Sequence, residues 1–268
     1  MLRGFYAAAS GMITQQRQQE ALSNNLANVN TPGYKADQVA IRAFPEMLMQ
    51  KIDARKTPTT SSMNIPQNQL IGSLNTGAYV QEYVPDFKTG ALNQTYLPTD
   101  MAIDHQQVPD ENGSLFFTVQ NNAGDLRLTR NGNFTIDGEG MLVTNEGYYV
   151  LDVNGEPIAT NDHQFTVLPD GTLQIGEEAV ALELSYVEDT NDLEKEGNGL
   201  YAGEVADNLP ADAIYSIRQG FLERANVDPG LSMTQMMEAY RLFETNQRVL
   251  QAYDQSLDKA VNDIGRLG

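Results

Sequence analysis

The sequence predicts an α+β, mainly β protein: an antiparallel β core domain flanked by N- and C-terminal amphipathic helices that pair as a coiled coil. Both ends repeat apolar residues at alternating steps of three and four, which is the spacing of a helical seam. The middle alternates short Val-, Leu-, Phe- and Tyr-rich runs with Asn-Gly and Asp-Gly pairs, which is typical of hairpins. The expected domains are an N-terminal helix (1–30), an extended linker or arm (31–75), the β domain (76–225) and a C-terminal helix (226–268).

The clearest helical pattern lies at the C-terminus, where no Pro or Gly interrupts residues 233–264. A helix of that length is about 45–50 Å long at roughly 1.5 Å per residue. One narrow apolar stripe on so long a helix requires a partner. The expected seam consists of Met233, Met236, Tyr240, Phe243, Leu250, Leu257, Val261 and Ile264, with Gln247 and Asp254 as polar interruptions.

A weaker seam at the N-terminus consists of Leu2, Phe5, Ala9, Met12 and Leu26, with the polar Gln16, Gln19 and Ser23 between them. An ordinary packing helix of a globular domain is the alternative, but matching seams at both termini favour a terminal coiled coil. Asn24, Asn25 and Asn28 follow, and Asn side chains compete for backbone hydrogen bonds, so the helix is expected to end there. Pro32-Gly33 then suits the two central positions of a type II turn.

Composition excludes several classes of function. The formal charge of −19 argues against binding to nucleic acid or to an anionic membrane, because no basic stripe is present to neutralise phosphate. The absence of cysteine excludes disulfides, thiolate nucleophiles and Cys-ligated zinc. The first residues, MLRGFYAAASGM, have too short an apolar core for a signal peptide. Any export is therefore expected to occur without a cleaved signal.

No catalytic, cofactor-binding or metal-binding constellation is apparent, so the chain is predicted not to be an enzyme and to take no small-molecule substrate. The chain has two histidines, His105 and His163, and both are expected in surface loops. Asp152–Glu156 has only part of a calcium-loop pattern and is better explained as a hairpin turn. The Met233, Met236 and Met237 cluster is either an adaptable binding surface or a packed helix face.

Three other segments have patterns of their own. Residues 43–52 have apolar spacing compatible with a helix, and the Pro-, Ser- and Thr-rich stretch 56–62 reads as exposed and extended, with a flexible linker as the alternative. Residues 105–114 form an irregular insert. Residues 193–209 are acidic and Gly-rich, which predicts a mobile surface loop.

Several motifs resemble bacterial flagellar basal-body rod and hook proteins. SGM at 10–12 and NNLANVNTPGYK at 24–35 are similar to the family's N-terminal motif, and GFLERANVD at 220–228 to its closing segment. TDMAID at 99–104, LFFTV at 115–119, LTRNGNFTIDGEGMLVTNEGYYVLDVNGEPI at 128–158 and LPDGTL at 168–173 match the β core in order. The 105–114 insert replaces a short Gly-containing link that family members commonly carry.

The resemblance implies a structural subunit of the flagellar basal-body rod, nearest the distal rod proteins. Such a subunit self-assembles into a helical tube that links motor to hook, with copies of itself and other rod or hook subunits as partners. The chain length leaves little room for the additional outer domain of longer hook proteins. Residues 36–75 are then expected to pack on neighbouring subunits.

The expected assembly interface comprises the two seams and the Asn cluster. Its residues are Leu2, Phe5, Ala9, Met12, Asn24, Asn25, Leu26, Asn28, Met233, Met236, Tyr240, Phe243, Leu250, Leu257, Val261 and Ile264. Both termini are expected to be largely disordered in the free subunit and to fold on polymerisation. A secreted β-domain glycan hydrolase and a surface-binding module are the alternatives, and neither explains a helical seam at each end.

Overall fold

The computed structural model describes residues 2–56, 64–110, 112–161, 163–203, 209–210 and 212–265. The chain divides into two compact units. One, the helical unit, comprises residues 1–23, 38–83 and 230–268. The other, the β unit, comprises residues 24–37 and 84–229. Neither described helix is long and apolar enough to cross a membrane.

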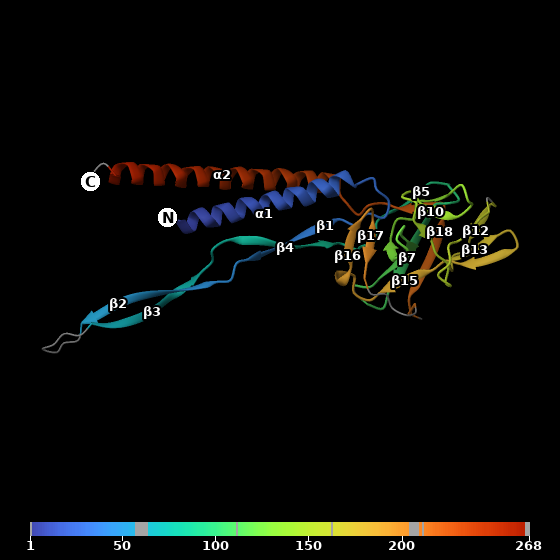
Figure 1. The fold of residues 1–268 in the computed structure, drawn as a ribbon, viewed down its shortest axis with the longest axis horizontal. Coiled ribbons are helices and arrows are strands. Elements are labelled where there is room, and N and C mark those ends of the chain that lie inside the picture. Colours follow the sequence, from blue (N-terminus) through green and yellow to red (C-terminus); the bar gives the residue numbers. More distant parts are fainter. Residues whose placement is uncertain are drawn as a thin grey trace. The chain divides into compact units, whose positions relative to one another are not determined.

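The helical unit contains most of α1 (Leu2–Ala27) and α2 (Pro229–Gly265), which Figure 1 shows in blue and red. A side chain added at Gly4 would overlap the Tyr253 phenol, and one at Gly11 would lie 3.0 Å from the Asn246 amide nitrogen. As the contacts advance seven residues along α1, they move back seven residues along α2. The two helices therefore run antiparallel and side by side in this unit.

Two hairpin-like ladders accompany the helices. β1 (Asp37–Ala43) pairs with β4 (Ala78–Pro85), and β2 (Met47–Lys56) pairs with β3 (Asn64–Leu74). The prediction of a helix over 43–52 is therefore wrong, because β2 pairs along its whole length with β3, from Met47 opposite Leu74 to Lys56 opposite Asn64. Continuous pairing with a partner strand outweighs a weak local spacing. Of the predicted extended stretch, residues 57–62 lie outside the described residues.

The β unit is built around an eight-stranded sheet of order β16-β17-β8-β7-β11-β10-β9, with β15 also paired to β7. A three-stranded sheet (β12-β13-β14) and the pairs β18-β6 and β19-β5 complete it. These strand pairings are antiparallel. The predicted class, mainly β and antiparallel with two helices, is confirmed.

The strands of the β unit have the following bounds: β5 Leu92–Gln94, β6 Met101–Gln107, β7 Ser114–Gln120, β8 Leu126–Thr129, β9 Phe134–Ile136, β10 Leu142–Thr144, β11 Tyr149–Val150, β12 Phe165–Val167, β13 Thr172–Ile175, β14 Glu178–Ala181, β15 Leu184–Val187, β16 Glu194–Gly197, β17 Leu200–Ala202, β18 Ile214–Gln219 and β19 Phe221–Glu223. A short 3₁₀ turn, Thr190–Asp192, connects β15 to β16.

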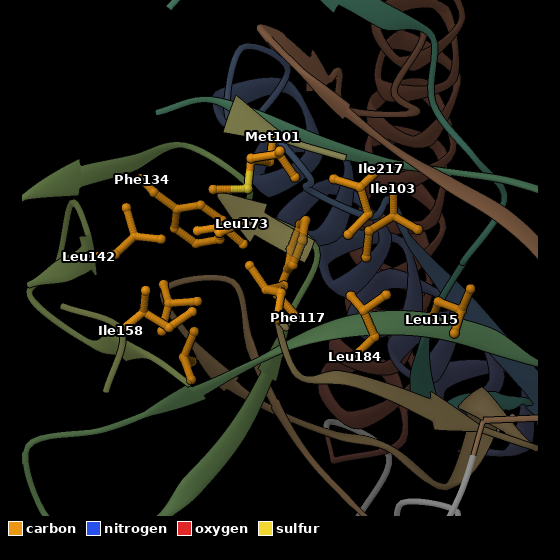
Figure 2. Packing of buried hydrophobic residues seen from close by; sticks show 14 of the residues in the cluster. Met101, Ile103, Leu115, Phe117, Phe134, Leu142, Ile158, Leu173, Leu184 and Ile217 are labelled. Carbon is orange, nitrogen blue, oxygen red and sulfur yellow. The ribbon is translucent and has the colours of Figure 1, made fainter. Parts of the chain in front are cut away.

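The core of the β unit lies on both sides of β7. Figure 2 shows Phe117 among Met101, Ile103, Leu173 and other apolar side chains of the main cluster. Phe116, one residue earlier, belongs instead to a second cluster that includes Tyr201. Because successive side chains point to opposite faces of a strand, the unbroken apolar run LFFTV corresponds to a strand buried on both faces.

The Asn-Gly and Asp-Gly pairs mark turns, but they do not all act in the same way. Gly155 and Gly171 have φ of 78° and 91°, as the sequence predicts for residues in the left-handed region. After Asp137 the positive φ falls instead on Gly140, at 83°. The Asp137 carboxylate accepts the backbone N–H groups of residues 139 and 141, which lengthens this turn beyond two residues.

The predicted mobile loop over 193–209 is wrong in its first half. β16 and β17 form a hairpin around Asn198-Gly199, where φ is 52° and 73°. Leu200 and Tyr201 are buried and pair with β8. Two of the acidic residues that suggested a loop, Glu194 and Glu196, lie on β16, which is mostly exposed. Residues 204–208 lie outside the described residues.

Candidate functional site

Three of the sequence motifs meet at a buried group of charges in the β unit, which we call the ion cluster: Lys35, Arg130 and Glu223. Lys35 Nζ lies 2.7 Å from Glu223 Oε1, and Arg130 Nη2 lies 2.8 Å from Glu223 Oε2. The three side chains are 1%, 0% and 2% exposed, so this is a fully desolvated cluster. Charges so deeply buried occur in proteins only when they are paired and hydrogen-bonded.

The ion cluster contains two cations and one anion, and its pKa shifts follow from that imbalance. Burial, followed by the like charge of Arg130, lowers the pKa of Lys35 to about 8. Burial alone would raise the pKa of Glu223, but Arg130 and Lys35 outweigh it and lower the pKa. Further hydrogen bonds hold the cations: Lys35 donates to the Lys88 carbonyl at 2.9 Å, and Arg130 Nη1 donates to the Leu115 carbonyl at 2.7 Å. Arg130 Nη2 contacts Glu223 as an ion pair but has no hydrogen-bond partner. The cluster is therefore a structural lock rather than a site with a reactive group.

The turn that follows α1 is held against the other two motifs. Tyr34 N–H donates to the Thr31 carbonyl at 3.3 Å, and Gly33 has φ of 69°, as expected for a type II turn through Pro32-Gly33. Gly33 N–H donates to the Glu223 carbonyl at 2.8 Å. A Cβ on Gly33 would overlap the backbone carbonyl of Arg130. Glycine is required here both for its conformation and for close approach.

The Asn cluster ends α1 and ties it to the segment that follows. Asn25 is 5% exposed; its amide donates to the Asp37 carbonyl and accepts the Asp37 N–H, both at 2.9 Å. It also accepts from the Tyr34 hydroxyl at 3.0 Å. Asn28 donates to the carbonyl and side-chain oxygens of Asn24. The Asn28 side chain thus adds to the backbone bond that the Asn24 carbonyl already accepts at the end of α1, and Asn25 fixes the backbone of Asp37, the first residue of β1.

A further junction, which we call the Asn226 clamp, joins three segments through which the chain passes into and out of the β unit. The Asn226 side chain accepts from Ala36 N–H at 2.8 Å and donates to the Asp86 carbonyl at 2.6 Å. Asp86 N–H in turn donates to the Ala36 carbonyl at 2.8 Å. The sequence pattern does not predict this role of Asn226, although the residue lies within the closing motif at 220–228.

His105 lies in strand β6, so its expected place in a surface loop is wrong. Its Nε2 atom is 3.1 Å from the Thr89 hydroxyl. Burial, followed by the charge of Arg130, lowers the pKa of His105 below its ordinary value. His163 is exposed beside a turn, as predicted. Among the described residues, no group of three or more His, Cys, Asp or Glu side chains is placed to hold a metal ion.

The predicted seam residues occupy two kinds of position. Partly buried are Phe5, Ala9, Met12, Leu26, Met236, Phe243, Leu250 and Leu257. Met233, Tyr240 and Val261 are 51%, 55% and 70% exposed. The side chains of Leu2 and Ile264 lie outside the described residues.

The face of α2 that packs inward within the chain does not coincide with the predicted seam. At every second seam position, the inward residue is the one just before the predicted residue. The inward face contains the buried Ser232 and Ala239, in place of Met233 and Tyr240. Of the polar interruptions, Gln16, Ser23, Gln247 and Asp254 are exposed, whereas Gln19 is partly buried.

The contact face of α1 is made by small residues, which an apolar count overlooks. Gly4, Ala8 and Gly11 follow one another at steps of four and three; Ala8 is 7% exposed, and the two glycines face Tyr253 and Asn246. Glycine leaves room for these larger side chains. The sequence signal that was available is the spacing of the small residues themselves.

Family models match three parts of the chain. "Flagella basal body rod protein" matches residues 5–35, "Flagellar hook protein FlgE/F/G D1 domain" residues 112–179, and "Flagellar basal body rod FlgEFG protein C-terminal" residues 218–263. The first and third contain Lys35 and Glu223, and the second contains Arg130, so each model supplies one member of the ion cluster.

Similar proteins extend over the full length. The flagellar hook-basal body complex protein FlhO of Bacillus subtilis (strain 168) is 42% identical, with all of both chains covered. The basal-body rod protein FlgG of the same organism is 31% identical over 98% of this chain and 99% of its own. FlgF of Caulobacter vibrioides is 29% identical over the whole of both. The chain belongs to the family of flagellar basal-body rod and hook proteins.

Proposed function

We propose that this chain is a structural, non-catalytic subunit of the flagellar basal-body rod, which polymerises through its terminal helices into a helical tube between motor and hook. Relatives named as rod proteins match it from end to end, which favours a rod subunit. The named relatives and models give no support to a glycan hydrolase or a surface-binding module. Its proposed partners are copies of itself and other rod or hook subunits. The chain is proposed to be exported to the flagellum without a cleaved signal peptide.

The distribution of exposed apolar side chains carries this proposal. Of the eighteen large hydrophobic residues that are exposed among the described residues, thirteen belong to the helical unit: Tyr6, Ile13, Ile41, Phe44, Tyr79, Tyr83, Leu231, Met233, Met237, Tyr240, Leu242, Val249 and Val261. The helical unit is nevertheless the smaller of the two. Exposed apolar surface concentrated in this way marks an interaction surface.

Charge is divided between the units in a way that also supports assembly through the helices. The helical unit holds ten Lys and Arg against nine Asp and Glu, and the β unit holds seven against 27, which makes +1 and −20 of the total −19. Copies of a nearly neutral unit can pack closely, whereas copies of a strongly acidic unit repel one another. We infer that helical units form the packed wall of the tube and that β units are held apart from their own copies.

The helices are proposed to pair as a coiled coil and to become fully ordered only on assembly. In α2 only Ser232 and Ala239 are buried among the residues whose side chains are described. So little burial stabilises a long helix weakly, because helices in proteins depend on packing. Far-UV circular dichroism across concentration tests this: helix content should rise as large particles form. A full set of protected helical amides in the dilute monomer would count against it.

A single charge on the inward face tests assembly itself. Leu250→Asp places a carboxylate on the partly buried face of α2, whereas Gln251→Asp places the same group at an exposed neighbouring position. We expect the Leu250 variant to sediment as a monomer with a folded β unit, and the Gln251 variant to form large particles. Tubes from Leu250→Asp like those of the unmodified chain would contradict assembly through the helices.

A further inference from the structure

An open groove lies between α1 and β4, within the helical unit. Its cavity volume is about 450 Å³, and it is lined by Ser10, Ile13, Thr14, Arg17, Phe44 and residues 78–83. The Phe44 and Tyr79 rings lie 5.1 Å apart at one side, and Ile13 and Tyr83 are 56% and 45% exposed. We call this the aromatic groove. Its volume falls within the range of about 300–1,000 Å³ that is usual for binding pockets.

Several polar side chains along the aromatic groove already have partners within the chain. Ser10 donates to the Ala7 carbonyl at 2.9 Å, and Thr14 donates to the carbonyl oxygens of Ser10 and Ala78. Arg17 is paired with Glu20 at 2.9 Å. Groups that are already hydrogen-bonded gain little from a polar ligand, so the groove favours an apolar occupant.

A surface of matching character lies on α2. Met233, Met237 and Tyr240 follow one another at steps of four and three and are each more than half exposed, at 51%, 57% and 55%. We call them the Met patch. They lie on a different face of the helix from Asn246 and Tyr253, which are the residues opposite α1. Methionine is unbranched and adapts its shape, which suits insertion into an irregular groove.

Charge favours a second copy of this chain as the occupant. The helical unit has a net charge of only +1, so two such units approach without strong repulsion. Glu238 and Arg241 lie beside the Met patch in the sequence, and Arg17 and Glu82 line the groove, so charges of both signs accompany each surface. Groove and patch are different surfaces of one chain, and a contact between unlike surfaces propagates into an open filament rather than closing.

We propose that the aromatic groove of one copy receives the Met patch of the next copy, as an amphipathic helix lying in an apolar groove. This contact rests on the proposed function, since it is one of the contacts through which the rod subunit polymerises. It assigns partners to Met233 and Tyr240, which are exposed within a single chain.

The absence of cysteine from the natural chain allows a clean cross-linking test. Copies carrying Ile13→Cys in the groove are mixed with copies carrying Met237→Cys in the patch, assembled, oxidised and separated without reductant. Leu242→Cys is the matched control, because Leu242 is 46% exposed on another face of the same helix. Docking places the first two sulfurs within disulfide range, so we expect about tenfold more cross-linked dimer than with the control. Tyr83→Cys provides a second groove position.

Sedimentation of the same mixtures separates the two proposals. Particles that form with equal cross-linking for Met237→Cys and Leu242→Cys, or with none at either groove position, overturn the groove contact and leave the rod function standing. If the unmodified full chain forms no particles over the whole accessible concentration range, self-assembly fails and the groove contact fails with it. Particles with selective cross-linking at Met237 support both.

Discussion

Replacing Glu223 by Gln tests whether the ion cluster holds the β unit together. The substitution keeps the size and one acceptor oxygen of the side chain but removes the negative charge. Lys35 and Arg130, which are 1% and 0% exposed, then lose the carboxylate that pairs with both of them, and the charge of Asp86 on Lys35 does not replace that pair. The two positive charges also repel each other, and this repulsion is one reason why the pKa of Lys35 is lowered.

The expected cost follows from the burial. Removing one partner of a buried ion pair typically costs about 3–5 kcal/mol, whereas whole domains are stable by only about 5–15 kcal/mol. With a denaturant dependence of about 2 kcal/mol per molar urea, a loss of about 4 kcal/mol lowers the unfolding midpoint by about 2 M. Much of the stability of the β unit therefore depends on this one carboxylate.

Urea titration followed by near-UV circular dichroism of tyrosine measures the effect, since the chain has twelve Tyr and no Trp. Asp104→Asn is the control: it breaks the Asp104–Arg218 pair, whose side chains are 21% and 48% exposed. An exposed pair contributes about 0–1 kcal/mol. If the two variants unfold at the same urea concentration, the argument that the ion cluster is a structural lock is refuted.

Three further substitutions have defined outcomes. Gly33→Ala should destabilise the β unit by clearly more than Gly147→Ala in the same titration, because Gly147 has open space around it and carries only a left-handed backbone cost of about 1–2 kcal/mol. Lys35 has a pKa of about 8 in the folded chain, below its ordinary value, so above that pH the unfolded chain holds this proton and the folded chain does not. The free energy of unfolding, measured relative to Lys35→Met, should therefore rise by about 2 kcal/mol between about pH 7.5 and 9.5. A fall across this window would contradict the lowered pKa. Gly4→Ala should lower the helix content of assembled material despite the better helix propensity of alanine, and Tyr253→Ala in the same chain should restore it.

The helices were predictable in extent but not in the direction they face. Periodicity places α1 and α2, and the Asn cluster ends α1 where expected. The face of α2 that packs inward differs from the predicted seam, because packing depends on the shapes of both helices. Gly4 and Gly11 leave space that Tyr253 and Asn246 occupy, and an apolar count of either helix alone contains no such information.

The ion cluster could not be predicted from local sequence. Lys35 and Glu223 are 188 positions apart, and Arg130 and Glu223 are 93 apart. Each looks like an ordinary surface charge in its own motif, and only the folded chain brings them together. The 193–202 hairpin was not predicted because acidic and glycine residues dominate the local composition. Two buried residues, Leu200 and Tyr201, anchor the hairpin through their pairing with β8.

The Asn226 clamp has a mechanical consequence for a structural subunit of a rod. The chain segments that leave the β unit at Ala36, Asp86 and Asn226 are hydrogen-bonded to one another, and the ion cluster joins residues beside two of them. Tension applied through any one of these segments is thereby shared by the others before it reaches a strand of the β sheet. A pull on one segment is then resisted in parallel at one joint, and no single strand has to resist peeling alone.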